Sequence, residues 1–135
     1  CPGGVASSTA AGAGLHCNSA ISGCTHGTHV AGIVAGSGAP DGAQGVAPGA
    51  SLIAIQVFSH FPGQGGVMSY TSDQIKGLER VYALKDTFQI AAVNMSLGGG
   101  QYTATCDATN SAIKAAIDNL RSAGIRDLRY GNLCE

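Results

Sequence analysis

Between residues 51 and 123, apolar runs of strand length alternate with longer amphipathic segments, and this alternation constrains the fold more than any other feature. Residues 51–58 have the length and the Ile and Val content of a strand covered on both faces, and residues 89–95 are the next expected strand. Residues 71–82 and 107–123 carry their apolar residues on one helical side. Strand, helix, strand, helix is the order of an α/β domain, so we expect a parallel sheet flanked by helices, with active-site loops at the carboxyl ends of the strands.

Both amphipathic segments carry further helix signals. In the first, Thr71 and Gln74 match a capping box. Gly124 follows the second and is expected to end it. The predicted core-facing residues are Ile75, Leu78 and Tyr82 on the first helix and Ala112, Ile113, Ala116, Ile117 and Leu120 on the second.

A third helix is predicted where small residues follow two histidines. Residues 25–36 read Thr-His-Gly-Thr-His-Val-Ala-Gly-Ile-Val-Ala-Gly. A small, apolar run of this kind is typical of a helix buried on nearly all sides. His26 stands at its start, and an imidazole there can take a proton from a weak nucleophile and return it to a leaving group. His26 is therefore either a general base or a structural histidine of a core helix.

Three segments together resemble the subtilisin-like serine endopeptidases. Residues 25–36 resemble the histidine box of that family, in which the first histidine of His-Gly-Thr-His is the catalytic base, and this implies that role for His26. Residues 45–57 resemble the family's Gly-Val-Ala-Pro turn and the core strand after it, and residues 93–99 resemble a strand that ends in Ser-Leu-Gly-Gly. The resemblance covers about residues 19–124 and implies a subtilisin-like α/β fold, incomplete in this chain.

The same resemblance assigns a substrate-binding edge, made of Ser96, Leu97, Gly98 and Gly99. An extended polypeptide substrate would add to this edge as a strand, and main-chain pairing of that type gives affinity with little choice of sequence. Gly98 and Gly99 have a second interpretation as a turn that requires positive φ. We expect Gly65 and Gly66 to form the opposite edge of the cleft.

Hydrolysis by a serine nucleophile also needs the serine and a carboxylate that orients the histidine. Residues 1–40 contain no Asp or Glu, and no Gly-Thr-Ser-Met-like turn follows residue 124. We therefore predict that these 135 residues alone have no peptidase activity. The alternative is a non-catalytic peptide-binding or structural fragment, and a third hypothesis is a small metal-binding or disulfide-stapled domain.

After Gly124 the sequence departs from the family. In residues 125–135, Gly131 and Asn132 echo an Ala-Gly-Asn motif whose asparagine donates to the oxyanion, which makes Asn132 a candidate for that role. However, this segment carries Arg126, Asp127 and Arg129, and buried charges of a central strand are costly unless they are paired.

The sequence thus divides into a loop-rich segment (1–24), a family-like core (25–124) and a divergent tail (125–135) of one partial peptidase domain. We attribute the tail to a frameshift, an altered gene end or an artificial chain boundary.

Neither a catalytic metal nor another cofactor is expected. His26 and His29 are three residues apart, whereas the zinc-protease helix has histidines four apart with a glutamate between them. Some relatives bind calcium near residues 36–45, but Asp41 is the sole carboxylate there and a calcium site needs several oxygen ligands. Asp41 is therefore interpreted as a turn residue, and His16 and His60 as solvated loop histidines.

Charge and hydropathy exclude two classes of partner. With 7 basic and 8 acidic residues, the chain has no basic footprint for nucleic acid. No apolar run is long enough to span a bilayer, and no signal-peptide pattern is present, so we expect a soluble chain that has been processed or cut from a longer one. The open edges of an incomplete sheet favour self-association.

Five cysteines, none in a Cys-x-x-Cys pair, favour disulfides in a secreted, extracellular protein over zinc or redox chemistry. Cys17 and Cys24 flank a short loop and are the first predicted bridge. Because the number is odd, one cysteine either pairs outside the chain or remains a buried thiol.

Overall fold

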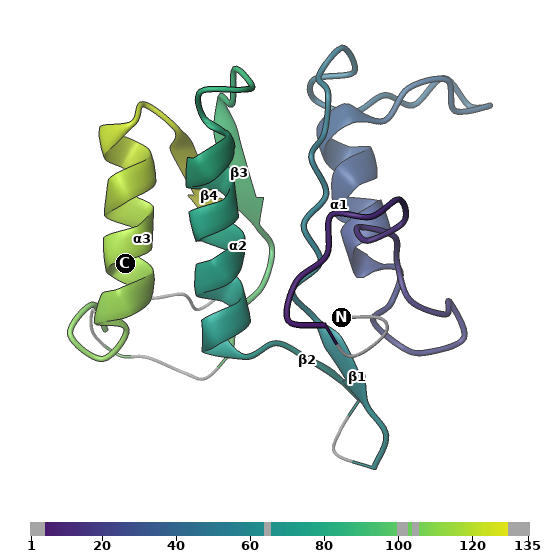
Figure 1. Cartoon of the computed structure of the whole chain (residues 1–135). Helices are drawn as coiled ribbons and strands as arrows, with labels where there is room; N and C mark the ends of the chain where they lie inside the picture. The colour runs from purple at the N-terminus through teal and green to yellow at the C-terminus, as the bar shows by residue number, and fades with distance from the viewer. Residues whose placement is uncertain (1–4, 64–65, 100–102, 104–105, 130–135) are drawn as a thin grey trace. The chain divides into compact units, whose positions relative to one another are not determined.

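A computed structural model describes residues 5–63, 66–99, 103 and 106–129 of the chain. They belong to two compact units, Cys1–Ser69 and Tyr70–Glu135. Among these described residues, the first unit has one helix and a small hairpin, and the second has two helices and two strands; Figure 1 shows their course.

The second unit has the α/β character that the sequence predicts. Its elements in chain order are α2 (Thr71–Leu84), β3 (Ala92–Met95), α3 (Ser111–Ser122) and β4 (Arg126–Arg129). Strands β3 and β4 pair in parallel, with Ala92 opposite Arg126 and Met95 opposite Arg129. Because α3 connects two parallel neighbours, this part of the chain is a β-α-β crossover. The predicted parallel sheet with flanking helices is confirmed here.

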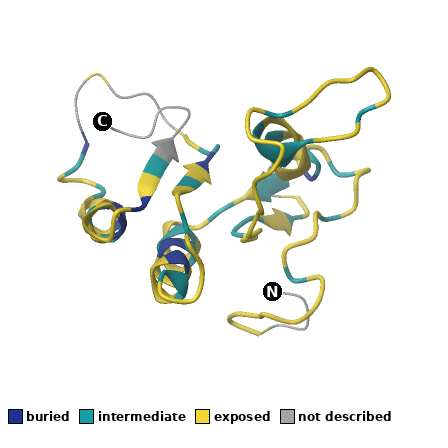
Figure 2. Cartoon of the chain, turned by 90° about the horizontal axis from the view of Figure 1, so that it is seen from above, coloured by how far each residue is buried: buried dark blue, intermediate teal, exposed yellow. Residues whose placement is uncertain are grey.

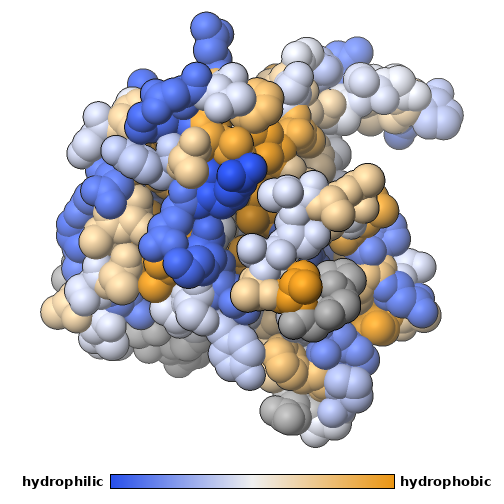
Figure 3. Space-filling model, viewed as in Figure 1, coloured by the Kyte–Doolittle hydropathy of each residue, from blue (hydrophilic) through white to orange (hydrophobic). Residues whose placement is uncertain are grey.

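A hydrophobic core joins α2, α3 and β3 in the second unit. The two helices pack against each other, and both carry buried positions (Figure 2). The side chains of Ile117 and Leu120 on α3 are fully buried. The remaining members come from both helices, from β3 and from the residue before β4, and they are Leu78, Val81, Met95, Ile113 and Ile125. Hydrophilic side chains cover the outward face of α2 (Figure 3). The amphipathic pattern therefore predicted most of the core-facing residues of both helices, but Ala112, at the start of α3, is exposed and the prediction for it is wrong.

Several element boundaries differ from the expectation. The predicted capping box is wrong, because α2 begins at Thr71 itself and Tyr70 occupies the cap position without a side-chain hydrogen bond. Val81 is buried on this helix, while Tyr82 is exposed and lies beneath the Lys85 ammonium. Strand β3 and helix α3 each start later than predicted, but Gly124 ends the helical region with a φ of +79° as expected.

Helix α1 (His26–Ala35) is present in the first unit, but the prediction that it is buried is wrong. None of its residues is buried, and Ile33 is 67% exposed. The physical reason is that among the described residues of this unit Cys24 alone is a buried hydrophobic residue, so no apolar layer covers the helix. Small residues here allow close packing without ensuring it.

The carboxyl end of α1 is instead held by the chain that returns along it. The backbone N–H groups of Gly45, Val46 and Ala47 donate to the carbonyls of Gly36, Ile33 and Val34 at 2.8, 2.9 and 2.7 Å. A Cβ atom on Gly45 would lie 2.7 Å from the backbone nitrogens of Ala35 and Gly36, so only glycine allows this approach.

The predicted strand over residues 51–58 is also wrong. This segment forms neither helix nor strand, and its residues 51–56 are exposed. A strand exists only through pairing with a neighbour, and none of the described residues pairs with this run. Strands β1 (Ser59–Phe61) and β2 (Gly66–Met68) form an antiparallel hairpin just after it, so His60 lies in a strand opposite Val67 rather than in a loop.

The charged segment after Gly124 does form a strand, which corrects the expectation that its charges oppose one. In the described sheet β4 has a neighbour on one side only, and Arg126 is exposed. The Asp127 side chain is 4% exposed and accepts from Nε and Nη2 of Arg121 at 2.7 and 3.4 Å. This hydrogen bond raises the pKa of Arg121. Pairing therefore satisfies the one carboxylate that β4 buries.

Candidate active site

His26 is the first residue of α1, and its side chain is exposed. Its backbone N–H donates to the carbonyl of Gly23 at 3.2 Å, so the turn before the helix runs directly into the first helical residue. Thr25 occupies the cap position and gives the helix no side-chain hydrogen bond. The histidine is thus presented at a helix start that is set by the preceding loop.

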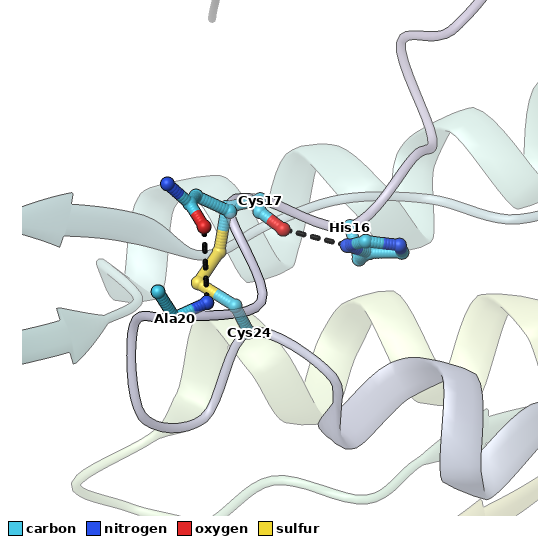
Figure 4. Close-up of a disulfide and its surroundings, with 5 residues drawn as sticks. His16, Cys17, Ala20 and Cys24 are labelled. Atoms are coloured by element: carbon cyan, nitrogen blue, oxygen red, sulfur yellow. Dashed lines mark hydrogen bonds between the residues drawn. A yellow bond between two sulfur atoms is a disulfide. The ribbon is translucent and has the colours of Figure 1, made fainter.

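That loop is closed by the predicted disulfide between Cys17 and Cys24, which is confirmed (Figure 4). Their Cα atoms are 5.2 Å apart, and Cys24 is buried. Nδ1 of His16 donates to the Cys17 carbonyl oxygen at 2.6 Å, so His16 is exposed but not merely solvated.

The imidazole of His26 has no carboxylate or hydroxyl partner among the residues that the structure describes. His29, one turn further along α1, is likewise exposed. Within the described ranges, no three His, Cys, Asp or Glu side chains are grouped as metal ligands. Asp41 accepts from the backbone N–H of Ala43 at 3.0 Å, which is the geometry of a turn residue.

The candidate substrate edge, Ser96–Gly99, lies in the second unit directly after β3, at its carboxyl end. Nδ2 of Asn94 donates to Oγ of Ser96 at 2.9 Å, and Leu97 packs against the hydrophobic core. Gly98 and Gly99 are exposed. Neither belongs to the glycines with positive φ in the described part of the chain, so the alternative interpretation as a turn is not supported.

Of the remaining candidates, only Gly66 lies among the described residues. Gly66 begins β2 in the first unit, with a φ of +100°, and pairs with Phe61. Gly65 and Asn132 lie outside the described residues, so their predicted roles stay predictions.

Sequence reasoning missed two residues that shape these segments. Asn94 holds Ser96, and the signal for it is that Asn94 is the one polar residue of the apolar run 90–95. Gly45 allows the chain to return along α1, and its signal is its place at the start of the Gly-Val-Ala-Pro segment.

Comparison with known proteins decides the family. The model of the subtilase family, Peptidase_S8, matches residues 7–128, which include the His26 helix, the Ser96–Gly99 edge and most of β4. The chain belongs to the subtilase family. This confirms the predicted resemblance and the predicted fold class.

Individual relatives of this subtilase are proteases from bacteria and fungi. It is 38% identical to alkaline serine exoprotease A of Vibrio alginolyticus over 73% of this chain and 16% of that protein. It is 41% identical to the subtilase-type proteinase psp3 of Schizosaccharomyces pombe over 73% of this chain and 20% of that protein. It is 37% identical to subtilisin E of Bacillus subtilis over 76% of this chain and 23% of that protein.

The subtilase chain therefore spans less than a quarter of the length of these relatives. No solved structure matches it. Among the described residues, the helices are all too short or too polar to cross a bilayer.

Proposed function

We propose that this chain is a segment of a secreted subtilisin-like serine endopeptidase that supplies the general base, His26, and one edge of the substrate cleft, Ser96–Gly99. The observation that carries the proposal is the position of His26. It is the first residue of a helix inside the region that matches the family. Its imidazole is exposed and has no hydrogen-bond or ion-pair partner among the described residues.

In the proposed reaction, the His26 imidazole takes the proton of a serine hydroxyl as the serine oxygen bonds to the peptide carbonyl carbon. The imidazolium then gives this proton to the leaving amine, and water repeats the sequence on the acyl-enzyme. Residues 1–40 contain no Asp or Glu, and no Gly-Thr-Ser-Met-like turn follows residue 124. We propose that other segments of the protein supply the serine and the orienting aspartate, and that the chain alone is inactive.

The substrate is proposed to be an extended polypeptide that adds as a strand along Ser96–Gly99. Two features favour this edge. Gly98 and Gly99 are exposed, and apart from Gly99 and its two chain neighbours no described residue has an atom within 4 Å of the position that a Cβ on Gly99 would take. The Asn94–Ser96 hydrogen bond and the packing of Leu97 fix the start of the segment while its glycines stay accessible. Backbone pairing there needs no side chain on the protein.

Secretion is proposed on chemical grounds. The Cys17–Cys24 disulfide is the kind of bond that forms and persists in oxidising compartments. Cys106 is also in a disulfide. The proposed mechanism uses no metal or other cofactor, and it involves no nucleic acid or membrane partner.

The test uses a fluorophosphonate, which labels an activated serine covalently, and a casein hydrolysis assay. For residues 1–135 alone we expect neither labelling nor hydrolysis. For the full-length gene product we expect both, with the label on a serine outside these residues. His26→Ala should abolish labelling, whereas the matched variant His29→Ala, on the same helix, should keep it. Labelling of the isolated chain that disappears in His26→Ala would refute the proposed inactivity.

A second candidate function is peptide binding without catalysis, which the exposed Gly98–Gly99 edge favours. A full-length gene product that does not label, yet binds an extended peptide through residues 96–99, would support this function and overturn the endopeptidase assignment.

A further inference from the structure

The disulfide Cys17–Cys24 ends two residues before His26, and a continuous series of turns connects the two sites. Inside the loop, the Ile21 N–H donates to the Asn18 carbonyl at 2.9 Å, and the Cys24 N–H donates to the Ile21 carbonyl at 3.1 Å. Oδ1 of Asn18 also accepts from the Ala20 N–H at 3.0 Å (Figure 4). The next turn, from Gly23 to His26, enters α1.

The amino end of α1 lacks the other devices that order a helix start. It has no side-chain cap, no acidic residue in its first turn and no buried residue. A ten-residue helix of this kind is marginal by itself in water. Its carboxyl end is different, because Gly45, Val46 and Ala47 hydrogen-bond to the carbonyls there. Within the described part of the chain, the disulfide with its buried Cys24 is therefore the one element that fixes the His26 end of α1.

We infer that the Cys17–Cys24 disulfide is a positioning element for His26, so that reduction of this bond loosens the start of α1 and lowers catalytic turnover. The inference rests on the proposed function only for the effect on turnover. The effect on the helix start follows from the fold alone.

The redox step uses a dithiol as the reductant. One dithiol sulfur attacks Sγ of Cys17, which is the more exposed of the two cysteines, and the Sγ of Cys24 leaves as a thiolate. The second dithiol sulfur then displaces Cys17 Sγ and closes a cyclic disulfide. Two electrons and two protons end on the cysteine pair, and the dithiol is oxidised.

Hydrogen exchange of the 135-residue chain tests the effect on the helix. We expect the amides of His26 and His29, whose acceptors are Gly23 and Thr25, to exchange on the order of tenfold faster or more in Cys17→Ser/Cys24→Ser. The amides of Val46 and Ala47, at the other end of α1, should change less. Cys106→Ser, which removes a different disulfide, is the matched control and should leave the His26 and His29 amides unchanged.

Turnover of the full-length gene product tests the effect on catalysis. We expect kcat to fall about 10²-fold in the double serine variant, since a small displacement of a catalytic group has an effect of this size. KM should stay within about twofold, because the substrate edge lies in the other unit. Dithiothreitol should reproduce the loss in wild type and have no further effect on the double variant.

The outcomes separate the two proposals. Unchanged exchange at His26 and His29 in the double variant would overturn the positioning role, whatever the activity. Faster exchange in a full-length protein that shows no peptidase activity would support the positioning role and overturn the proposed function. Faster exchange with an unchanged kcat would refute the catalytic consequence of the disulfide.

Discussion

Truncation of Leu120 to alanine tests whether the stability of this chain resides in the second unit. Leu120 is 0% exposed and belongs to the core cluster of α2, α3 and β3. The backbone N–H of Ile125 also donates to the Leu120 carbonyl at 3.0 Å, so the residue lies where α3 turns toward β4. Leu120→Ala removes apolar atoms from this point and leaves the backbone bonds available.

The expected loss is about 3 kcal/mol in the free energy of unfolding. Three carbon groups at about 0.8 kcal/mol each account for roughly 2.4 kcal/mol of transfer free energy. Incomplete collapse of the cavity adds to this, and buried leucines truncated to alanine span about 2.7–5 kcal/mol. A small domain has only about 5–15 kcal/mol in total, so the variant should lose a large share of its stability.

Urea unfolding and native-state hydrogen exchange measure this loss. In the variant, the core amides of the second unit should exchange roughly 100-fold faster, which corresponds to about 3 kcal/mol. Ile33→Ala is the control, since Ile33 is a branched aliphatic residue of the same size as Leu120 and also stands in an apolar helical pattern, but is 67% exposed. That change should stay within about 0.5 kcal/mol. A loss below about 1 kcal/mol for Leu120→Ala, or an equal loss for both variants, would refute the argument that the stability of the chain resides in the buried core of the second unit.

Two further predictions concern contacts that each unit depends on. Gly45→Ala should destabilise α1 by about 1–3 kcal/mol, because a Cβ would lie 2.7 Å from the backbone nitrogens of Ala35 and Gly36. Circular dichroism should show a loss of helix in this variant and no loss in the control Gly49→Ala, which has open space around its Cβ position. Arg121→Gln should lower the thermal unfolding midpoint more than Lys114→Gln does, because Arg121 pairs with a carboxylate that is 4% exposed, whereas Lys114 pairs with an exposed one. Equal shifts in calorimetry would contradict the argument that Asp127 needs Arg121 as the partner of its buried charge.

The sequence predicted the second unit better than the first, and Ile33 and Leu120 show why. Both stand in apolar helical patterns, but a pattern identifies only the side of a helix that can be buried. Whether a layer covers that side depends on residues elsewhere, which the described part of the first unit does not supply. The same reason applies to residues 51–58, whose apolar pattern suits a strand that has no partner here.

The charged tail shows a second limit. Arg121 lies in a helix and Asp127 in a strand, six residues later. Neither the spacing of a helix nor that of a strand therefore predicts their contact from the sequence. Only the turn at Gly124 makes the ion pair. In contrast, the His26 motif and the Cys17–Cys24 bridge depend on short contiguous segments, and sequence reasoning located both.

The pairing of β3 with β4 gives the sheet two chemically different borders. Charged residues occupy three of the four positions of β4, and such residues discourage a further strand from pairing. Strand β3 reads Ala-Val-Asn-Met and carries no charge. We therefore expect the β4 border of the described sheet to resist pairing with a further strand, and the β3 border to be the side at which another segment of polypeptide continues the sheet.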